Sequence, residues 1–167
     1  MPYKCPNMAD LLVNLLKLPP LAPEKVTARG VLIRRANPFE QTPIREFVAK
    51  NFAIGWADEI SVAYARQPVT LFVATRETEI LGFAAYECTR RGFFGPMGVI
   101  ESAREMGIGT ALLLAGMWGL YEMGYVYGII GAAGPMEFYQ RAVGAIEIPE
   151  SKPGIYTNIL RATPPKA

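Results

Sequence analysis

The 167-residue sequence predicts one mixed α/β domain, in which a mostly antiparallel sheet carries helices on both faces. Three apolar runs over 69–75, 80–88 and 93–100 follow one another with short connections, which is typical of antiparallel strands joined by hairpins. Further along, apolar runs alternate with longer helical segments, and such crossovers allow some parallel pairing. Hydrophobic residues make up 51% and charged residues 19%, which favours a globular chain over a disordered one.

The first part of the chain is predicted to be mostly helical, with one strand. Its leucine-rich start is closed by Pro19 and Pro20. Thr42 and Pro43 have the pattern of an N-cap followed by a first-turn proline. Gly55 separates the helix that begins there from the next one. The expected elements are a helix over 8–17, a strand over 31–35, and helices over 42–54 and 56–66.

The remainder is predicted to alternate strands and helices. The turn over 77–79 joins two apolar runs as a hairpin. Gly124 and Gly144 each follow a helical pattern, at the position where a glycine commonly ends a helix. The expected elements are strands over 69–75, 80–88 and 93–100, a helix from the 104–109 loop to about residue 123, a strand over 125–130, a helix over 135–143, and strands over 145–148 and 155–160. The chain thus divides into an N-terminal extension over 1–28, a domain over 29–162 and a tail over 163–167.

The composition excludes several kinds of chemistry. The sequence contains no histidine, which removes Ser-His-Asp and Cys-His nucleophiles in their usual forms and every histidine-containing zinc site. Aspartate occurs only as Asp10 and Asp58, so we expect no aspartate-rich metal site and no metal. Cys5 and Cys88 are the only cysteines and form no CxxC motif, which favours a reduced, cytoplasmic protein.

The charge pattern restricts the partners. The formal net charge is +2, and basic and acidic residues are interspersed, whereas a nucleic-acid-binding face needs clustered Lys and Arg. No apolar stretch reaches the ~20 residues that span a bilayer, so we expect no membrane partner. A homodimer that forms through the leucine-rich N-terminal segment stays an open alternative.

The segment with most chemical information is 95–110. An apolar strand ends there in a loop that contains Gly107 and Gly109 and turns directly into a helix. The free N–H groups at the start of that helix, together with its dipole, suit a pyrophosphate, and Arg104 can add positive charge. A tight strand-to-helix turn with no ligand is the alternative. The P-loop pattern is absent and the dinucleotide pattern is incomplete, because Leu112 stands where its last glycine would be.

Pro96 adds a second signal within the strand over 93–100. Proline lacks the N–H that a central strand donates, so it favours a bulge or a place where two strands part. A parted strand leaves backbone groups free to bind an extended molecule. An ordinary edge strand is the alternative.

The spacing of Val99, Arg104, Gly107 and Gly109 resembles the acetyl-CoA signature of the GNAT superfamily of N-acetyltransferases. About thirty residues later, the segment 135–145, with its Phe-Tyr pair and following glycine, resembles the second motif of that family. The resemblance covers residues 30–161. It implies the family's mixed sheet with splayed central strands, acetyl-CoA as co-substrate, and transfer of an acetyl group to a primary amine of a small molecule or peptide end.

The resemblance also implies roles for individual residues. Met97 and Val99 would pair their backbone with the pantetheine arm, and Tyr139 would stand near the thioester sulfur. The pyrophosphate would be wrapped by Arg104, Glu105, Met106, Gly107, Ile108, Gly109 and Thr110. The chain departs from the family at Ala132, where an asparagine is common.

Tyr139 is the candidate proton donor, since a phenol with a pKa of ~10 stays protonated when a thiolate with a conjugate pKa of ~8.5 departs. Glu87 and Glu101 are the candidate general bases, and solvated surface carboxylates are their alternative reading. Cys88, with no histidine to activate it, is expected to be structural.

We expect the acceptor site to draw on less patterned regions. Asp58 and Glu59 beside Trp56 are acidic candidates there, together with Glu87. The aromatic candidates for the pocket walls are Trp56, Tyr64, Phe93, Phe94 and Tyr156. A non-catalytic module that binds or senses acetyl-CoA is the alternative function.

Overall fold

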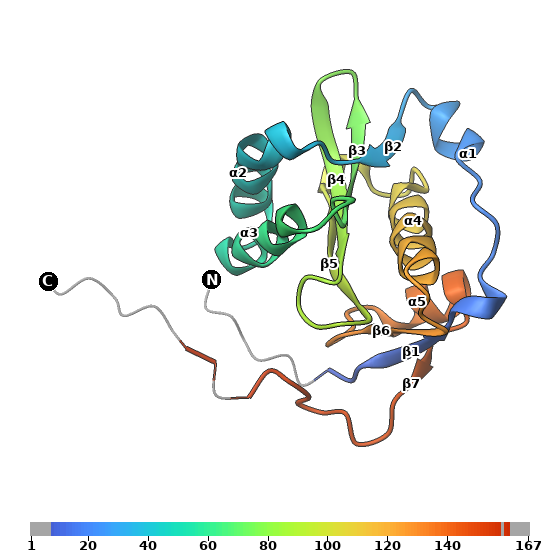
Figure 1. Ribbon diagram of the computed structural model, residues 1–167. Helices are drawn as coiled ribbons and strands as arrows, with labels where there is room; N and C mark the ends of the chain where they lie inside the picture. Colours follow the sequence, from blue (N-terminus) through green and yellow to red (C-terminus); the bar gives the residue numbers. More distant parts are fainter. Residues whose placement is uncertain (1–7, 158, 161–167) are drawn as a thin grey trace, which may run out of the picture.

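The structure, a computed structural model, describes residues 8–157, 159 and 160. These residues form a 7-stranded sheet in the order β2-β3-β4-β5-β6-β1-β7 (Figure 1). Neighbouring strands are antiparallel except for β5 and β6, which are parallel. The predicted mixed, mostly antiparallel sheet is therefore confirmed. The strands are β1 Leu11–Asn14, β2 Leu32–Arg35, β3 Leu71–Arg76, β4 Glu79–Tyr86, β5 Phe93–Val99, β6 Tyr127–Ile130 and β7 Ile146–Glu147.

Helices cover both faces of this sheet, as predicted. In Figure 1, α2 and α3 lie on one side of the central strands and α4 lies on the other. Each side has its own core, one built around Ile44, Val48 and Phe83 and the other around Leu112, Leu113 and Met117. The α-helices are α1 Glu24–Thr27, α2 Gln41–Asn51, α3 Ile54–Ile60, α4 Ile108–Glu122 and α5 Met136–Val143.

The predicted N-terminal helix over 8–17 is wrong. Leu11–Asn14 form strand β1, which pairs with β6 on one side and β7 on the other, and a 3-10 turn over Leu15–Lys17 follows. Leu11 and Val13 are fully buried and alternate with partly exposed residues, which is the period of two that a strand requires. A short leucine-rich run is compatible with either period, and the sheet edge offered by β6 decided between them.

Other elements also differ from the sequence prediction. A 3-10 turn over Pro38–Glu40 precedes α2, with the Asn37 N–H donating to the Glu40 carboxylate at 2.8 Å, so the helix begins before Thr42. Gly55 lies inside α3 and does not interrupt it. The predicted strand over 155–160 is not observed, since residues 155–157, 159 and 160 form no strand. Residue 158, the predicted tail over 163–167 and Cys5 lie outside the described residues.

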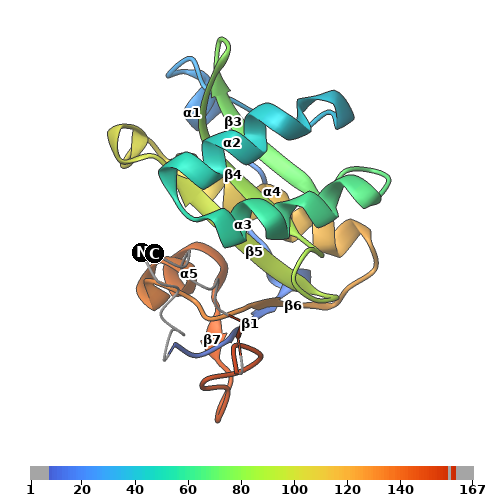
Figure 2. The same ribbon diagram turned by 90° about the vertical axis from the view of Figure 1, so that its left-hand side faces the viewer.

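Strands β5 and β6 part soon after they meet, which confirms the predicted splay. Their pairing consists of Phe93 with Ile129 and Phe94 with Ile130. Beyond Phe94, β5 stays paired with β4, and Figure 2 shows β6, β1 and β7 turning away from it. The parting begins at Gly95 and Pro96, where the register between β5 and β4 also shifts.

The parted edge of β5 carries free backbone groups. The Ile100 N–H donates to the Leu81 carbonyl beside β4 at 3.0 Å. Because hydrogen-bonding groups of successive strand residues point to opposite edges, those of Val99 and Met97 face the edge that β6 has left. The sequence assigned these two residues to the pantetheine arm, and their backbone orientation is compatible with that prediction.

Helix α4 approaches β5 closely through glycine. A Cβ at Gly116 would lie 2.5 Å from the Phe94 ring, and Phe94 is only 2% exposed, so the ring has no room to move. We expect Gly116→Val to lower the free energy of unfolding by about 1–3 kcal/mol through overpacking. Chemical denaturation measures the change. Gly134→Val is the control, because a Cβ there meets nothing within 4 Å, and its effect should stay within about 0.5 kcal/mol. Equal stability of the two variants would contradict this packing.

Candidate functional site

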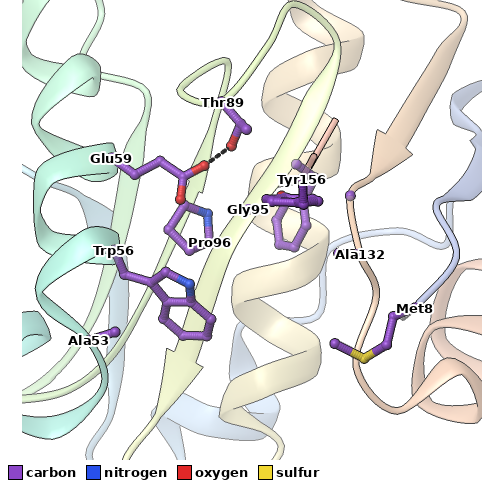
Figure 3. A pocket seen from close by; sticks show the side chains of 11 residues that line it. Met8, Ala53, Trp56, Glu59, Thr89, Gly95, Pro96, Ala132 and Tyr156 are labelled. Atoms are coloured by element: carbon purple, nitrogen blue, oxygen red, sulfur yellow. Dashed lines mark hydrogen bonds between the residues drawn. The ribbon is translucent and has the colours of Figure 1, made fainter. Parts of the chain in front are cut away.

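A cavity of about 280 Å³ lies where β5 and β6 part, on the side of the sheet covered by α3 (Figure 3). Its walls come from α3, the loop after β4, the start of β5, the loop after β6 and both ends of the described chain. The lining residues are Met8, Ala53, Trp56, Glu59, Thr89, Phe94, Gly95, Pro96, Gly131, Ala132 and Tyr156. Because most of these side chains are apolar, a polar group inside the cavity has a strong influence on what can bind there.

Glu59 is the charged residue among those that line the cavity. Its carboxylate accepts a hydrogen bond from the Thr89 hydroxyl, drawn as a dashed line in Figure 3. Burial raises the pKa of Glu59, while the Thr89 hydrogen bond and the nearby Arg90 charge oppose that rise. Asp58, the neighbouring acid that the sequence also proposed, is exposed and pairs with Arg45 at 3.1 Å. Of the two neighbours, Glu59 therefore faces the cavity.

Trp56 forms a rigid wall beside Glu59. Its ring stacks on Phe52 at 5.8 Å, and Phe52 meets Phe83 edge-on at 5.4 Å. Phe52 itself rests on Gly98 of β5, where a Cβ would lie 2.5 Å from its ring. The glycine thus lets this aromatic stack sit directly on the sheet, which fixes α3 and the position of Trp56.

The aromatic candidates from the sequence separate into two groups. Trp56, Phe94 and Tyr156 line the cavity. Tyr64 and Phe93 do not line it. Tyr64 packs in the core under α2 and α3. Phe93 packs against Gly131, where a Cβ would lie 3.1 Å from the Phe93 ring. Sequence reasoning missed Thr89 and Met8, since neither belongs to a motif and both reach the cavity only through the fold.

The loop before α4 has the geometry of an anion site. Gly107 is its N-cap residue, in the left-handed conformation with φ 81°, and it has no side chain to cap the helix. The Ala111 N–H donates to the Gly107 carbonyl at 3.1 Å, so the N–H groups of Ile108, Gly109 and Thr110 precede the helical ladder. Arg104 and Glu105 are exposed in the same loop, Met106 is partly buried, and a Cβ at Gly109 would meet Phe138 of α5 at 3.6 Å. The loop therefore presents free donors at the positive end of a helix.

The anion-type loop and the cavity lie along one strand. The loop follows the end of β5 at Val99, and the cavity is lined by Gly95 and Pro96 near its start. Between them run the free backbone groups of Met97 and Val99. An extended molecule with a phosphate group could lie along this edge and bring its far end to the cavity.

The three residues proposed for catalysis lie outside the cavity lining. Tyr139 is in α5 and only 9% exposed, with the Phe138 ring edge-on at 5.0 Å. Burial raises the pKa of Tyr139, so its hydroxyl keeps its proton at neutral pH. Glu101 is exposed in a 3-10 turn after β5. Their catalytic roles stay predictions.

Glu87 is built into the turn between β4 and β5. It is 2% exposed, accepts a hydrogen bond from the Gly92 N–H, and pairs with Arg66 at 3.7 Å. Its backbone is in the left-handed region with φ 61°, which turns its side chain inward at the end of the strand. Next to it, burial raises the pKa of the Cys88 thiol to about 11, so the thiol stays protonated, in agreement with a structural cysteine.

Asp10 holds the loop after β6 in place. The Ala132 N–H donates to the Asp10 carboxylate at 2.7 Å, and the Asp10 N–H donates to the Ser151 hydroxyl at 2.9 Å. Ala132 has a positive φ of 42°, a conformation that asparagine adopts more readily than alanine. The contact with Asp10 supports this backbone where the sequence departs from the GNAT pattern.

Among the described residues, no group of three or more His, Cys, Asp or Glu side chains is arranged to hold a metal ion. No helix within the same residues is long and apolar enough to cross a membrane.

No protein-family model matches the sequence, and no curated protein matches it. Solved structures share its architecture. A GCN5-related N-acetyltransferase from Sphaerobacter thermophilus matches with a TM-score of 0.64 and 21% identity, over 84% of this chain and 48% of that one. A GCN5-related glucosamine N-acetyltransferase region of a fungal multi-domain GH3 β-N-acetylglucosaminidase matches with a TM-score of 0.66 and 18% identity, over 84% of this chain and 20% of that one.

A GNAT family acetyltransferase from Brucella melitensis, solved in complex with acetyl-CoA, matches with a TM-score of 0.53 and 21% identity, over 66% of this chain and 80% of that one. The protein thus has the fold of the GCN5-related N-acetyltransferases, as the sequence resemblance predicted. The chain spans 20% and 48% of the lengths of the fungal and Sphaerobacter proteins.

The surroundings of Glu87 predict a structural contribution. We expect Glu87→Ala to lower the free energy of unfolding by about 1.5–3 kcal/mol, because it removes a charged acceptor from Gly92 and a partner from Arg66. Glu101→Ala, at an exposed position, should change it by less than about 0.5 kcal/mol. Thermal and denaturant unfolding measure both variants. A Glu87 variant as stable as the wild type would show that these contacts contribute little.

Proposed function

We propose that the protein transfers an acetyl group from acetyl-CoA to a primary amine of a small molecule or a peptide end. One observation carries the proposal: the free edge of β5 joins an uncapped helix N-terminus at one end to an acid-containing cavity at the other. The Brucella protein of the same fold was solved with acetyl-CoA, which supports that co-substrate. For this chain, a cytoplasmic location and the absence of a nucleic-acid or membrane partner stay predictions from the sequence.

In this proposal the cofactor follows the features of the strand in order. The N–H groups of Ile108, Gly109 and Thr110, with Arg104, bind the pyrophosphate at the positive end of α4. The backbone of Val99 and Met97 pairs with the pantetheine arm. The thioester then lies at the parting of the strands, beside the cavity that receives the amine.

The reaction needs a neutral amine, a stabilised oxyanion and a protonated leaving group. The amine nitrogen forms a bond to the thioester carbon, the C–S bond breaks, and the thiolate takes a proton. Backbone N–H groups of the parted strand are suited to the developing oxyanion, because fixed donors need no reorganisation. Tyr139 is the candidate that gives the thiolate its proton, and burial keeps its hydroxyl protonated before the thiolate forms.

The direct test measures release of CoA thiol from acetyl-CoA across amino acids, polyamines, aminoglycosides, simple monoamines and peptide N-termini, with acetyl-CoA affinity measured in parallel by calorimetry. Turnover with any of these amines supports the proposal. Tight acetyl-CoA binding with no turnover would favour a module of the same fold that binds or senses acetyl-CoA.

Gly109→Glu tests the pyrophosphate site. The residue lies in the first turn of α4, where an acid is favourable to the helix dipole, so we expect the domain to stay folded. The added carboxylate should repel the pyrophosphate and weaken acetyl-CoA binding by about 10-fold or more. Gly109→Ala is the control for bulk, because its Cβ would meet Phe138 at an ordinary 3.6 Å. Unchanged affinity of the Glu variant by calorimetry would refute this site.

Tyr139→Phe tests the proton donor. We expect turnover to fall by about 100-fold, the lower end of what a positioned acid contributes, with acetyl-CoA affinity unchanged. Tyr121→Phe is the matched control, because Tyr121 is 41% exposed on α4 and the same hydroxyl is removed. Wild-type turnover in the Tyr139 variant would assign this residue to packing alone.

A further inference from the structure

We propose that the acceptor is a compact monoamine, whose one ammonium group binds Glu59 and whose apolar, preferably aromatic, body packs against Trp56. This inference rests on the proposed acetyl transfer and narrows its substrate class. It depends on three properties of the cavity: its charge, its size and the rigidity of its apolar wall.

The charge of the cavity matches a single cation. Glu59 is the charged side chain among the residues that line it. The neighbouring Asp58 is exposed and paired with Arg45, and Glu87 is turned inward toward Gly92 and Arg66. A polyamine or an aminoglycoside carries several ammonium groups and would leave all but one without a carboxylate. Arg90, whose charge acts on Glu59, would repel the additional cations.

The size of the cavity matches a small acceptor body. At about 280 Å³ it lies just below the ~300–1,000 Å³ that small-molecule pockets usually occupy. Apolar side chains contribute most of its wall, including Trp56, Pro96 and Met8. A peptide end would bury backbone N–H and C=O groups here, and unpaired groups of that kind are costly.

Trp56 gives the body of the acceptor a fixed surface. Its ring is held by the stack on Phe52, which in turn rests on Gly98. Figure 3 shows Trp56 and Glu59 projecting from α3 toward β5, with Tyr156 and Met8 on the other side of the strand. A ring or branched chain lying on Trp56 would therefore keep its ammonium beside the Glu59 carboxylate.

Glu59 would also take the proton that makes the amine a nucleophile. Burial raises its pKa, which makes the carboxylate a better base than an exposed one. The groups around it are the Thr89 hydroxyl, the Arg90 guanidinium, the Cys88 thiol and, across the cavity, Tyr156. The ammonium gives one proton to Glu59, and the nitrogen then attacks the thioester carbon. As the C–S bond breaks, Tyr139 gives its proton to the CoA thiolate, the second proton of the nitrogen restores the Tyr139 hydroxyl, and Glu59 later releases its proton to solvent.

Binding tests the acceptor class without acetyl transfer. Trp56 is one of two tryptophans, so in a Trp118→Phe background its fluorescence reports on the cavity alone. We expect phenethylamine to bind the CoA-saturated protein at least about 10-fold more tightly than spermidine or kanamycin. Glu59→Gln, whose amide oxygen can still accept from Thr89, should weaken phenethylamine binding by about 10- to 100-fold. Asp58→Asn, the same change one residue away, should leave it unchanged.

Kinetics test the proton transfer. With phenethylamine and acetyl-CoA, Glu59→Gln should lower kcat/KM by about 100-fold or more and remove the acidic limb of its pH profile, while the acetyl-CoA affinity stays as in the wild type. Asp58→Asn should keep the wild-type kcat/KM and the acidic limb of the pH profile. A Glu59→Gln variant that keeps its turnover and its acidic limb overturns the role of Glu59 as the base.

The outcomes separate this inference from the proposed function. Tighter binding or faster acetylation of spermidine or kanamycin overturns the monoamine class and leaves acetyl transfer standing. Phenethylamine binding that Glu59→Gln does not weaken overturns the role of Glu59. Phenethylamine binding that depends on Glu59, with no thiol release, supports the acceptor site and counts against the acetyl transfer itself.

Discussion

The structure depends on the early parting of β5 and β6. Two residue pairs hold these strands together, and from Gly95 onward β5 has a partner on one edge only. Unpaired backbone groups inside a sheet are costly unless something else binds them. On the edge that β6 has left, the backbone groups of Met97 and Val99 stay unpaired. The parting therefore leaves a free backbone edge along β5, and the anion-type loop and the cavity lie at its two ends.

Two glycines allow the layers on either side of β5 to approach it. Gly116 lets α4 lie against Phe94 on one face, and Gly98 lets Phe52 rest on the strand on the other. Because both contacts are tighter than a side chain would permit, the strand is clamped between its two cores. The cavity wall at Trp56 is rigid for this reason, although Trp56 itself is only partly buried.

The two ends of the described chain meet beside the cavity through Asp10. Its backbone and carboxylate contact Ser151, Ala132 and Ile148, so that the N-terminal strand organises both the loop after β6 and the C-terminal segment. These bonds bring Met8 and Tyr156 to the same cavity. A segment that the sequence placed outside the domain as an extension thus contributes a strand to its sheet and a residue to its candidate site.

The sequence by itself determined the features that local chemistry encodes. The loop at Gly107, the helix ends at Gly124 and Gly144, and the irregular pairing of β5 around Pro96 each follow from the conformations that these residues allow or forbid. Tertiary structure decided the rest. Leu11 and Val13 fit a helix or a strand until β6 offers an edge, and Glu59, not Asp58, faces the cavity because successive helix residues point about 100° apart. Glu87 turns inward because the fold places the Gly92 N–H and the Arg66 guanidinium beside its carboxylate. Such choices depend on which groups the fold brings together, and the spacing of residues along the chain does not contain that information.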